Sequence, residues 1–360
     1  MELIKKILFV ICGFAMTALS ADCNRCEPDP CTCPPEPPCC DVPTAPTMAA
    51  YNKGANIDVC GSWDFYVTGT FLYWQPRQEQ MDVALTSFGV PPNNITGIGR
   101  LYDFSFDWKP AFKVGLGYSW DNDNWETYLQ YTRINTTMTT TVNPNLVAGE
   151  TLAGTWYAAQ LANLTQVSDK WSLDFNMFDL EFSRPYYNGT CLTFRFHYGL
   201  KAGWIDQNLD QTVSNVSNNV NSSLKSDSWL IGPRTGFYSN WQIGEGFRFF
   251  GNVAGALFYQ KFSSVEFRET FLSNDTQQYQ AFDYSVKTLN ASLETLLGVG
   301  WGTYFDRNNW HFDLFVGYES QLFLDQNQMR YLREASIGTD ISKAGNLNLH
   351  GLNVTAQFDF

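Results

Sequence analysis

Apolar and polar residues alternate through the segment 104–120, and this period of two restricts the fold more than any other feature of the sequence. The even positions carry large apolar side chains, namely Phe104, Phe106, Trp108, Phe112, Val114, Leu116, Tyr118 and Trp120. Most odd positions carry charged, hydroxyl or glycine residues. Successive side chains of a strand point to opposite faces. The pattern therefore predicts a β-strand with one face in lipid and one in water, and it recurs at 192–204 and 310–322.

Short and long connections alternate between the predicted strands. The short ones, rich in Asn, Asp and Gly, are 121–124, 184–190, 240–246 and 306–309, and the long ones lie near 75–102, 138–170, 206–227, 262–284 and 325–345. Outer-membrane barrels combine short periplasmic turns with long extracellular loops. We therefore predict an all-β protein in which residues 61–360 form a transmembrane antiparallel β-barrel of about ten strands, within a range of eight to fourteen.

One predicted strand changes phase. Its apolar residues occupy odd positions at first and even positions later, in the order Trp171, Leu173, Phe175, Leu180 and Phe182. A β-bulge near Met177 and Phe178 would keep all these side chains on one face. We therefore expect a bulge there.

Tryptophans concentrate near the ends of the predicted strands. Trp120 and Trp125 flank a short turn, and those beside long connections are Trp74, Trp171, Trp204 and Trp229. Indole rings favour the two membrane interfaces. We expect these side chains to face lipid at the two borders of the bilayer.

The first twenty residues have the organisation of a signal peptide. Lys5 and Lys6 precede an apolar run at 7–19, and small residues follow at 18–20. The run is too short to cross a bilayer of about 30 Å as a helix, and no later stretch of about 18 apolar residues exists. We predict cleavage of residues 1–20, export, and residence in a bacterial outer membrane. The formal charge of −13 argues against nucleic acid as a partner.

Residues 21–60 form a tail of different composition, which we expect in the periplasm. Its cysteines lie among prolines and are Cys23, Cys26, Cys31, Cys33, Cys39, Cys40 and Cys60. Such a segment cannot build a core. In an exported chain, dense cysteines point first to disulfides. Metal binding is the weaker alternative, because the spacing does not repeat as in a zinc ribbon, and we expect neither a metal nor a cofactor.

The predicted topology places two further features beside this tail. Cys60 precedes the first strand and Cys191 follows the turn at 184–190, so both lie at the periplasmic rim. The connectivity stays open between a Cys60–Cys191 bridge, bridges from either to the tail, and bridges within the tail. Closely spaced cysteines close strained loops. We therefore also expect disulfides to other envelope proteins or to a second copy of the chain.

The C-terminus alternates up to a terminal aromatic residue, in the order Leu352, Val354, Ala356, Phe358 and Phe360. It resembles the C-terminal recognition strand of proteins inserted by the outer-membrane barrel assembly machinery. The resemblance implies that this machinery is a partner and that Phe358 and Phe360 form the assembly signal. Thr355 departs from the pattern, which often has Gly there.

The stretch Gly-Ser-Trp-Asp-Phe-Tyr-Val-Thr-Gly-Thr-Phe-Leu-Tyr-Trp-Gln-Pro at 61–76 resembles the opening strand of the Legionella-type major outer membrane protein family. Segments 198–206 and 231–236 resemble later parts of that family. The resemblance covers about residues 60–360, and 71–76 is its most specific part. It implies a pore-forming barrel. The tail at 22–47 departs from the Legionella-type members and favours a chlamydia-related source, where disulfide-linked proteins stiffen the envelope.

If the aromatic faces contact outer-membrane lipid, the opposite faces line a lumen. The expected pore-lining residues are Lys109, Lys113, Asp174, Arg195, His197, Lys201, Arg234, Arg248, Glu294, Asp313 and Glu319. We therefore predict a water-filled path between these charges and an outer-membrane porin that allows passive diffusion of ions and small hydrophilic solutes. The alternative is a closed structural or adhesive barrel in which the charges pair, since a barrel of about ten strands is narrow.

We expect no enzymatic activity and name no catalytic residue. The three histidines are His197, His311 and His350. None of them lies in a recognisable catalytic motif.

Overall fold

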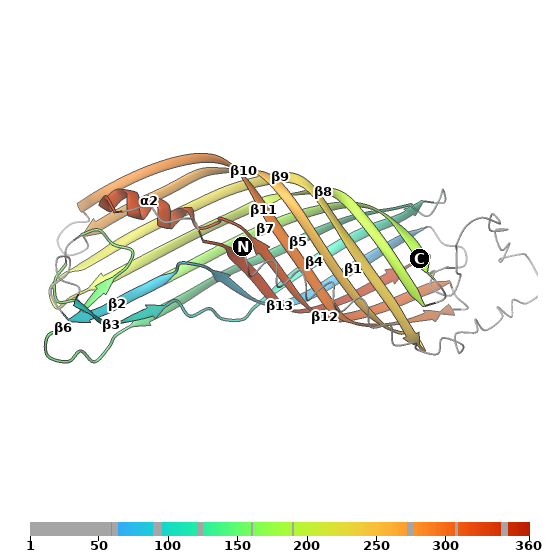
Figure 1. Cartoon of the computed structure of the whole chain (residues 1–360), viewed down its shortest axis with the longest axis horizontal. Helices are drawn as coiled ribbons and strands as arrows, with labels where there is room; N and C mark the ends of the chain where they lie inside the picture. The colour runs from blue at the N-terminus through green and yellow to red at the C-terminus, as the bar shows by residue number, and fades with distance from the viewer. Residues whose placement is uncertain are drawn as a thin grey trace, which may run out of the picture.

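Ten antiparallel strands close into a barrel in the computed structural model (Figure 1). In chain order the barrel strands are β1 (Phe65–Gln78), β4 (Lys109–Trp120), β5 (Trp125–Val142), β7 (Gln166–Asn188), β8 (Leu192–Ser214), β9 (Asn219–Gly244), β10 (Phe247–Phe271), β11 (Gln277–Phe305), β12 (Trp310–Phe323) and β13 (Leu347–Asp359). The structure describes residues 59, 64–88, 96–120, 125–159, 161–188, 191–271, 277–306, 309–339 and 345–360. The predicted fold class and strand number are confirmed.

The first and last strands complete the barrel. Val67 of β1 lies opposite Leu116 of β4 on one side and opposite Phe358 of β13 on the other. Every barrel strand thereby has two hydrogen-bonded neighbours, and no open edge is presented to lipid. The β9–β10 turn consists of Glu245 and Gly246 at φ angles of 52° and 81°, the left-handed conformation that tight hairpins require.

The barrel has walls of unequal height. The strands β7 to β11 contain 23 to 29 residues, whereas β1, β4, β12 and β13 contain 12 to 14. At about 3.4 Å per residue, the first group, here called the tall wall, extends well beyond the second group, the short wall. β5, with 18 residues, is intermediate.

A cap of smaller elements covers the inner face of the tall wall at its extracellular end (Figure 1). We use this name for the three-stranded sheet of β2 (Asp82–Phe88), β3 (Thr96–Asp103) and β6 (Glu150–Gly154), the segment 155–165, and the helix α2 (Gln328–Ile337). No helix among the described residues is long and apolar enough to cross a membrane.

Two of the five connections predicted as long loops consist mostly of barrel strand. β8 continues to Ser214 before β9 begins at Asn219, and β10 continues to Phe271 before β11 begins at Gln277. These extensions resemble loops in the sequence because Asn, Ser and Asp recur on their outward faces. The prediction assumed that every strand ends where its apolar outer face ends.

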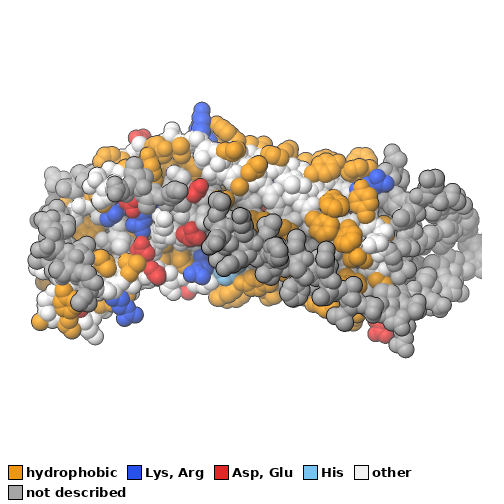
Figure 2. All heavy atoms as spheres, in the orientation of Figure 1, with side chains coloured by type: hydrophobic (Ala, Val, Ile, Leu, Met, Phe, Trp, Pro, Cys, Tyr) orange, Lys and Arg blue, Asp and Glu red, His pale blue; other side chains and the backbone are white. Residues whose placement is uncertain are grey.

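The polarity of the tall wall inverts along its strands. On the periplasmic side, Leu200, Ile231 and Leu257 point outward and are exposed. Towards the extracellular end, Leu209 and Phe267 are buried inside, and the outward positions are polar. Figure 2 shows hydrophobic side chains spread over one face of the barrel. The part of the barrel near the periplasmic end is therefore organised as a membrane barrel, and the part near the extracellular end as a water-soluble sheet. We call them the lower and the upper part.

This inversion, and not a bulge, explains the phase change in β7. The pairing of β7 with β5 and with β8 runs without a register shift through Met177 and Phe178. Trp171 and Phe175 are buried inside, whereas Phe178 is outside and exposed. The predicted bulge is wrong, because the apolar residues before and after the change serve opposite faces.

Several aromatic residues predicted to face lipid lie inside. Trp74 and Trp171 are fully buried, whereas Trp120 and Trp204 are half exposed on the outer face as expected. The strand predicted from residue 104 begins at Lys109. Phe104 and Phe106 precede it, and their rings contact Trp171, with centroids 6.3 Å and 5.6 Å away.

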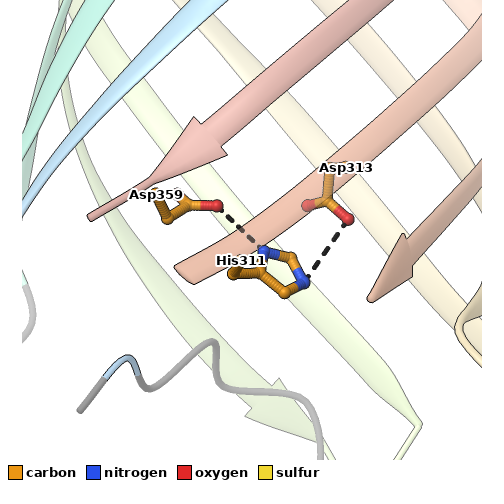
Figure 3. A group of neighbouring side chains, drawn as sticks. All are labelled: His311, Asp313 and Asp359. Atoms are coloured by element: carbon orange, nitrogen blue, oxygen red, sulfur yellow. Dashed lines mark hydrogen bonds and ion pairs between the residues drawn. The ribbon is translucent and has the colours of Figure 1, made fainter. Parts of the chain in front are cut away.

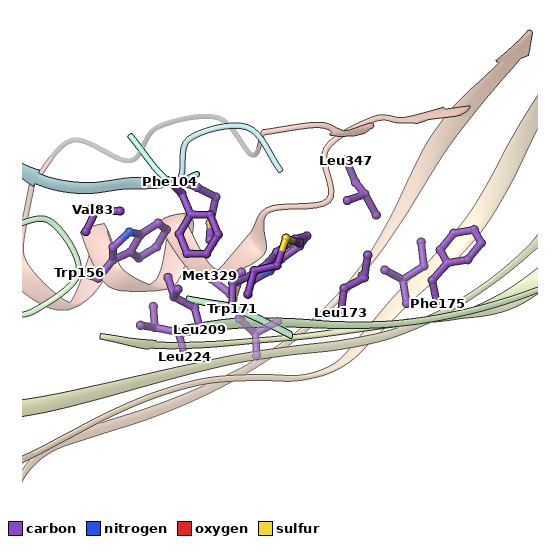
Figure 4. Packing of buried hydrophobic residues seen from close by; sticks show 14 of the residues in the cluster. Val83, Phe104, Trp156, Trp171, Leu173, Phe175, Leu209, Leu224, Met329 and Leu347 are labelled. Atoms are coloured by element: carbon purple, nitrogen blue, oxygen red, sulfur yellow. The ribbon is translucent and has the colours of Figure 1, made fainter. Parts of the chain in front are cut away.

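The apolar core lies between the cap and the tall wall (Figure 4). Val83 and Trp156 of the cap belong to the same buried cluster as Leu209 and Leu224 of the wall. Met329 of α2 belongs to it as well. This core gives the tall wall an apolar partner above the membrane, where lipid is absent.

The inversion predicts that adjacent residues of β8 respond differently to truncation. Leu209→Ala should lower the free energy of unfolding by about 2–5 kcal/mol, because it leaves a cavity in the core. Asn208→Ala, on the outer face, should change it by less than about 0.5 kcal/mol. Denaturant unfolding in detergent, followed by tryptophan fluorescence, measures both. Equal effects would contradict the assignment of faces.

Candidate functional site in the barrel lumen

Most of the charged residues predicted to line a pore lie in the lower part of the lumen. Those that point inward and are buried are Lys113, His197, Lys201, Arg234, Arg248, Glu294, Asp313 and Glu319. Arg195 also points inward and is four-fifths buried. Lys109 lies at the upper end of β4 with its ammonium 3.8 Å from Asp107. These placements follow from the strand period.

A central cluster joins opposite sides of the tall wall's inner surface. The ammonium of Lys201 on β8 lies 2.6 Å from Asp179 on β7 and 2.6 Å from Glu294 on β11. The guanidinium of Arg234 on β9 donates to Glu181 and, at 2.8 Å, to Glu294. Because β9 and β10 separate β8 from β11, the Lys201–Glu294 pair spans the curve of the wall.

The short wall carries a second bridge. Lys113 of β4 lies 2.5 Å from Glu319 of β12, although β1 and β13 lie between these strands. The other carboxylate oxygen of Glu319 accepts a hydrogen bond from Asn353 at 2.7 Å. A buried carboxylate with a cation and a further donor is well satisfied.

Aromatic side chains occupy space beside these charges. Tyr66 and Tyr128 stack with centroids 5.7 Å apart. Gly117 and Gly115 face their rings, and a Cβ at either glycine would collide with them. The ring of Trp74 lies 5.4 Å from the ammonium of Lys113. Side chains therefore fill the lumen at this level.

The exposed fraction of each residue shows whether water reaches the charged groups of the lumen. Lys201 has 0 % of its surface exposed, and His197 and Asp313 have 1 % each. A residue lining a water-filled pore would be accessible from the lumen. These groups are therefore removed from water, and Lys201 and Arg248 each lie against a carboxylate.

A triad of titratable groups lies near the periplasmic rim (Figure 3). Nδ1 of His311 is 2.9 Å from Asp359, and Nε2 is 3.6 Å from Asp313. Arg248 also binds Asp313. A metal would need one imidazole nitrogen and the carboxylates on a common side, whereas the two carboxylates contact opposite nitrogens. The arrangement fits an ion-pair network that ties β10, β12 and β13 together.

One predicted pore-lining residue is on the wrong face. Asp174 lies on the outer face of β7, where its carboxylate accepts from Asn135 at 2.9 Å. The prediction placed Trp171 on the lipid face, which turned Asp174 inward, but Trp171 is buried inside. Asp179 and Glu181, at odd-numbered positions of the same strand, point inward. Glu181 and Asp359 were missed, although the unbroken period of two from Trp171 identifies the face of Glu181.

The cap is attached to the tall wall by buried polar contacts that the sequence did not indicate. Glu269 of β10 is fully buried and accepts backbone hydrogen bonds from Ala158 at 2.6 Å and Ala159 at 2.8 Å. Gln211 of β8 accepts one from the backbone of Trp156 at 2.9 Å. Each contact satisfies a cap group that burial removes from water.

Charged groups in the cap are also shielded from water. The guanidinium of Arg330 lies 4.1 Å from the ring centroid of Trp156 and 3.2 Å from Asp82. Burial raises the pKa of Tyr157 to about 12. Burial also lowers the pKa of Arg333 to about 10, and the charge of Arg330 acts in the same direction. These cap groups are thus largely removed from water.

The remaining predicted residues lie at the periplasmic end. Phe358 is half exposed on the outer face, and the ring of Phe360 lies 5.6 Å from that of Trp310. Cys191 is buried beside the β7–β8 turn, and its carbonyl accepts from the backbone of Gln242 at 2.7 Å. The other candidate disulfide residues, Cys23, Cys26, Cys31, Cys33, Cys39, Cys40 and Cys60, lie outside the described residues.

The bridge between Lys113 and Glu319 predicts a non-additive response to mutation. Lys113→Met alone should cost about 3–5 kcal/mol of unfolding free energy, because it leaves a buried carboxylate without its cation. Adding Glu319→Met should recover most of this loss. Denaturant unfolding of the two single variants and the double variant closes the cycle. Additive losses would show that the two groups are not coupled.

Comparisons with solved structures return proteins that share little sequence with this chain. Solved structures similar to the chain include the outer membrane protease OmpT from Escherichia coli, with 10% sequence identity and a TM-score of 0.40, covering 85% of this chain and 99% of that one. A Pseudomonas aeruginosa FadL homologue has 7% identity and a TM-score of 0.28, covering 82% and 89%. No curated protein matches the chain.

A family model matches far more of the sequence than the short stretches that carried the resemblance. The model described as "Legionella pneumophila major outer membrane protein precursor" matches residues 59–360. That range contains every strand of the barrel. The chain belongs to the Legionella major outer membrane protein family and is an outer-membrane protein.

Proposed function

We propose that this protein is a structural barrel of the outer membrane whose lumen is closed to solutes, and not a general diffusion porin. The observation that carries the proposal is the central cluster around Lys201, which is completely buried and binds carboxylates of β7 and β11. An ion entering the lumen would have to displace these partners. Breaking buried ion pairs is costly, so the cluster opposes passage.

The cap supports the same proposal. It forms a second barrier at the extracellular end, where Trp156, Leu209 and Leu224 share an apolar core. An apolar constriction opposes the passage of hydrated ions because it does not replace their water. Two barriers of different chemistry, one charged and one apolar, then lie along the path.

A gated channel is the second candidate function. The observation that favours it is that the cap consists of elements inserted between wall strands, so it can move without breaking the barrel. Glu269 holds the segment 155–165 through two backbone hydrogen bonds. The family resemblance to pore-forming proteins points in the same direction. In this function the closed form is one of two states.

We further propose export with cleavage of residues 1–20 and covalent linkage to the envelope through the cysteine tail. Among the described residues of the barrel wall and its periplasmic rim, Cys191 is the one cysteine, and it is buried. Cross-links between molecules therefore depend on the tail. We propose no enzymatic role, since His197 and His311 are engaged in buried contacts within the lumen.

Planar-bilayer recording tests the closed lumen. The refolded protein should show no stable single-channel steps. Combining Asp179→Ser, Lys201→Ser and Glu294→Ser with Glu269→Gln removes the central cluster and weakens the attachment of the cap, and should produce small steps. The outward-facing pair Lys170→Ser and Asp174→Ser is the matched control and should stay silent. Porin-like steps in the unmodified protein would contradict the proposal of a closed structural barrel.

The same recordings separate the second candidate from the first. Glu269→Gln weakens the attachment of the cap, and a gated channel should then show brief openings. Glu266→Gln, on the outer face of the same strand, should not. If Glu269→Gln shows no openings although faster proteolysis demonstrates that its cap is released, the gated channel is excluded.

Envelope linkage is tested by electrophoresis of native envelopes with and without a reductant. We expect reductant-sensitive oligomers that disappear when the six cysteines between residues 23 and 40 are replaced by Ser. Cys191→Ser is the control and should leave the oligomers intact. Oligomer bands that are unchanged by the reductant, or that disappear in Cys191→Ser alone, would contradict linkage through the tail.

A further inference from the structure

The border between the two polarities of the tall wall is marked on the outer face by aromatic residues. Trp204 of β8 lies opposite Trp229 of β9, and the rings of Trp229 and Tyr259 of β10 are 5.6 Å apart. The outer face beside and below them is apolar: Leu289 of β11, opposite Tyr259, is 75% exposed, and Leu257 of β10 is 57% exposed. This row has the composition of the girdle at the outer membrane interface.

Two lysines sit directly opposite each other at this border. Lys261 of β10 is paired with Lys287 of β11, and on its other side it is paired with Trp229. Both lysines are on the outer face, next to Tyr259 and Leu289 in their own strands. Like charges directly opposite on adjacent strands are destabilising. No ion pair among the described residues offsets this pairing.

Neighbouring acids do not neutralise the pair. Asp227 lies 2.5 Å from Lys225, and Glu266 lies 2.7 Å from Arg268. Asp283 lies opposite Glu266, farther towards the extracellular end. Within the described part of the chain, no ion pair involves Lys261 or Lys287.

We propose that Lys261 and Lys287 form a binding site for the phosphate of an outer-leaflet lipid. An anion between the two ammonium groups replaces repulsion by two charge-assisted hydrogen bonds. Leu257 and Leu289 lie on the lipid side of the lysines and contact the acyl chains, and Trp229 lies beside the headgroup. Long lysine side chains reach the interface readily from such positions. The site therefore recognises a phosphate that is joined to acyl chains.

The test compares unfolding temperatures in vesicles of phosphatidylcholine alone and of phosphatidylcholine with lipid A. The unmodified protein should unfold at a higher temperature with lipid A. Lys261→Gln should raise the unfolding temperature in phosphatidylcholine, because it relieves repulsion, and should abolish most of the gain from lipid A. This reversal of sign is not expected of a residue with a merely structural role.

The matched control is Lys170→Gln with Lys225→Gln, which removes two other outward-facing lysines of the tall wall. It should keep the gain from lipid A. An equal loss in the control would show general attraction to a charged membrane and overturn the site. Inorganic phosphate added to phosphatidylcholine vesicles should give no comparable gain. If it restores the full gain, the site takes free phosphate and the lipid proposal fails.

Discussion

Closure of the sheet on itself is the constraint on which the rest of the structure depends. The pairing of β1 with β13 gives every wall strand two neighbours, so lipid meets no unsatisfied backbone group. A closed barrel has an inside, and with ten strands that inside is narrow. Inward-facing residues must then contact one another. The burial of Lys201 and Asp313 follows from this narrowness as much as from their own chemistry.

Because the walls are unequal in height, the strands of the tall wall pass through two environments, lipid and water. A strand that leaves the membrane exchanges lipid for water outside, so its outward residues become polar. Its inward residues then lose the charged partners of the lower lumen and become apolar, as at Leu209 and Phe267. The cap supplies the apolar surface that those residues need. The proposed closure of the lumen by the cap and the stabilisation of the tall wall thus have the same cause.

Charge in the lumen and charge at the membrane border follow opposite rules. Inside, each buried cation has a carboxylate within reach, as with Lys113 and Glu319, because an unpaired charge there would be costly. At the border, Lys261 and Lys287 face each other in register, which water and lipid headgroups tolerate. The same residue type is therefore a structural partner in one place and a binding group in the other.

The sequence alone determined the class of fold, the number of strands and the inward position of most charged residues, because a period of two is set by backbone geometry and does not depend on distant contacts. It did not determine where each strand stops. Trp171 and Asp174 were assigned to the wrong faces because alternation says which residues share a face, and not whether that face meets lipid, water or the cap. Only the tertiary structure decided this, since the cap comes from segments at 82–103, 150–165 and 328–337 that are distant in sequence. The Glu269 contacts with Ala158 and Ala159 link residues about a hundred positions apart, and no local pattern encodes them.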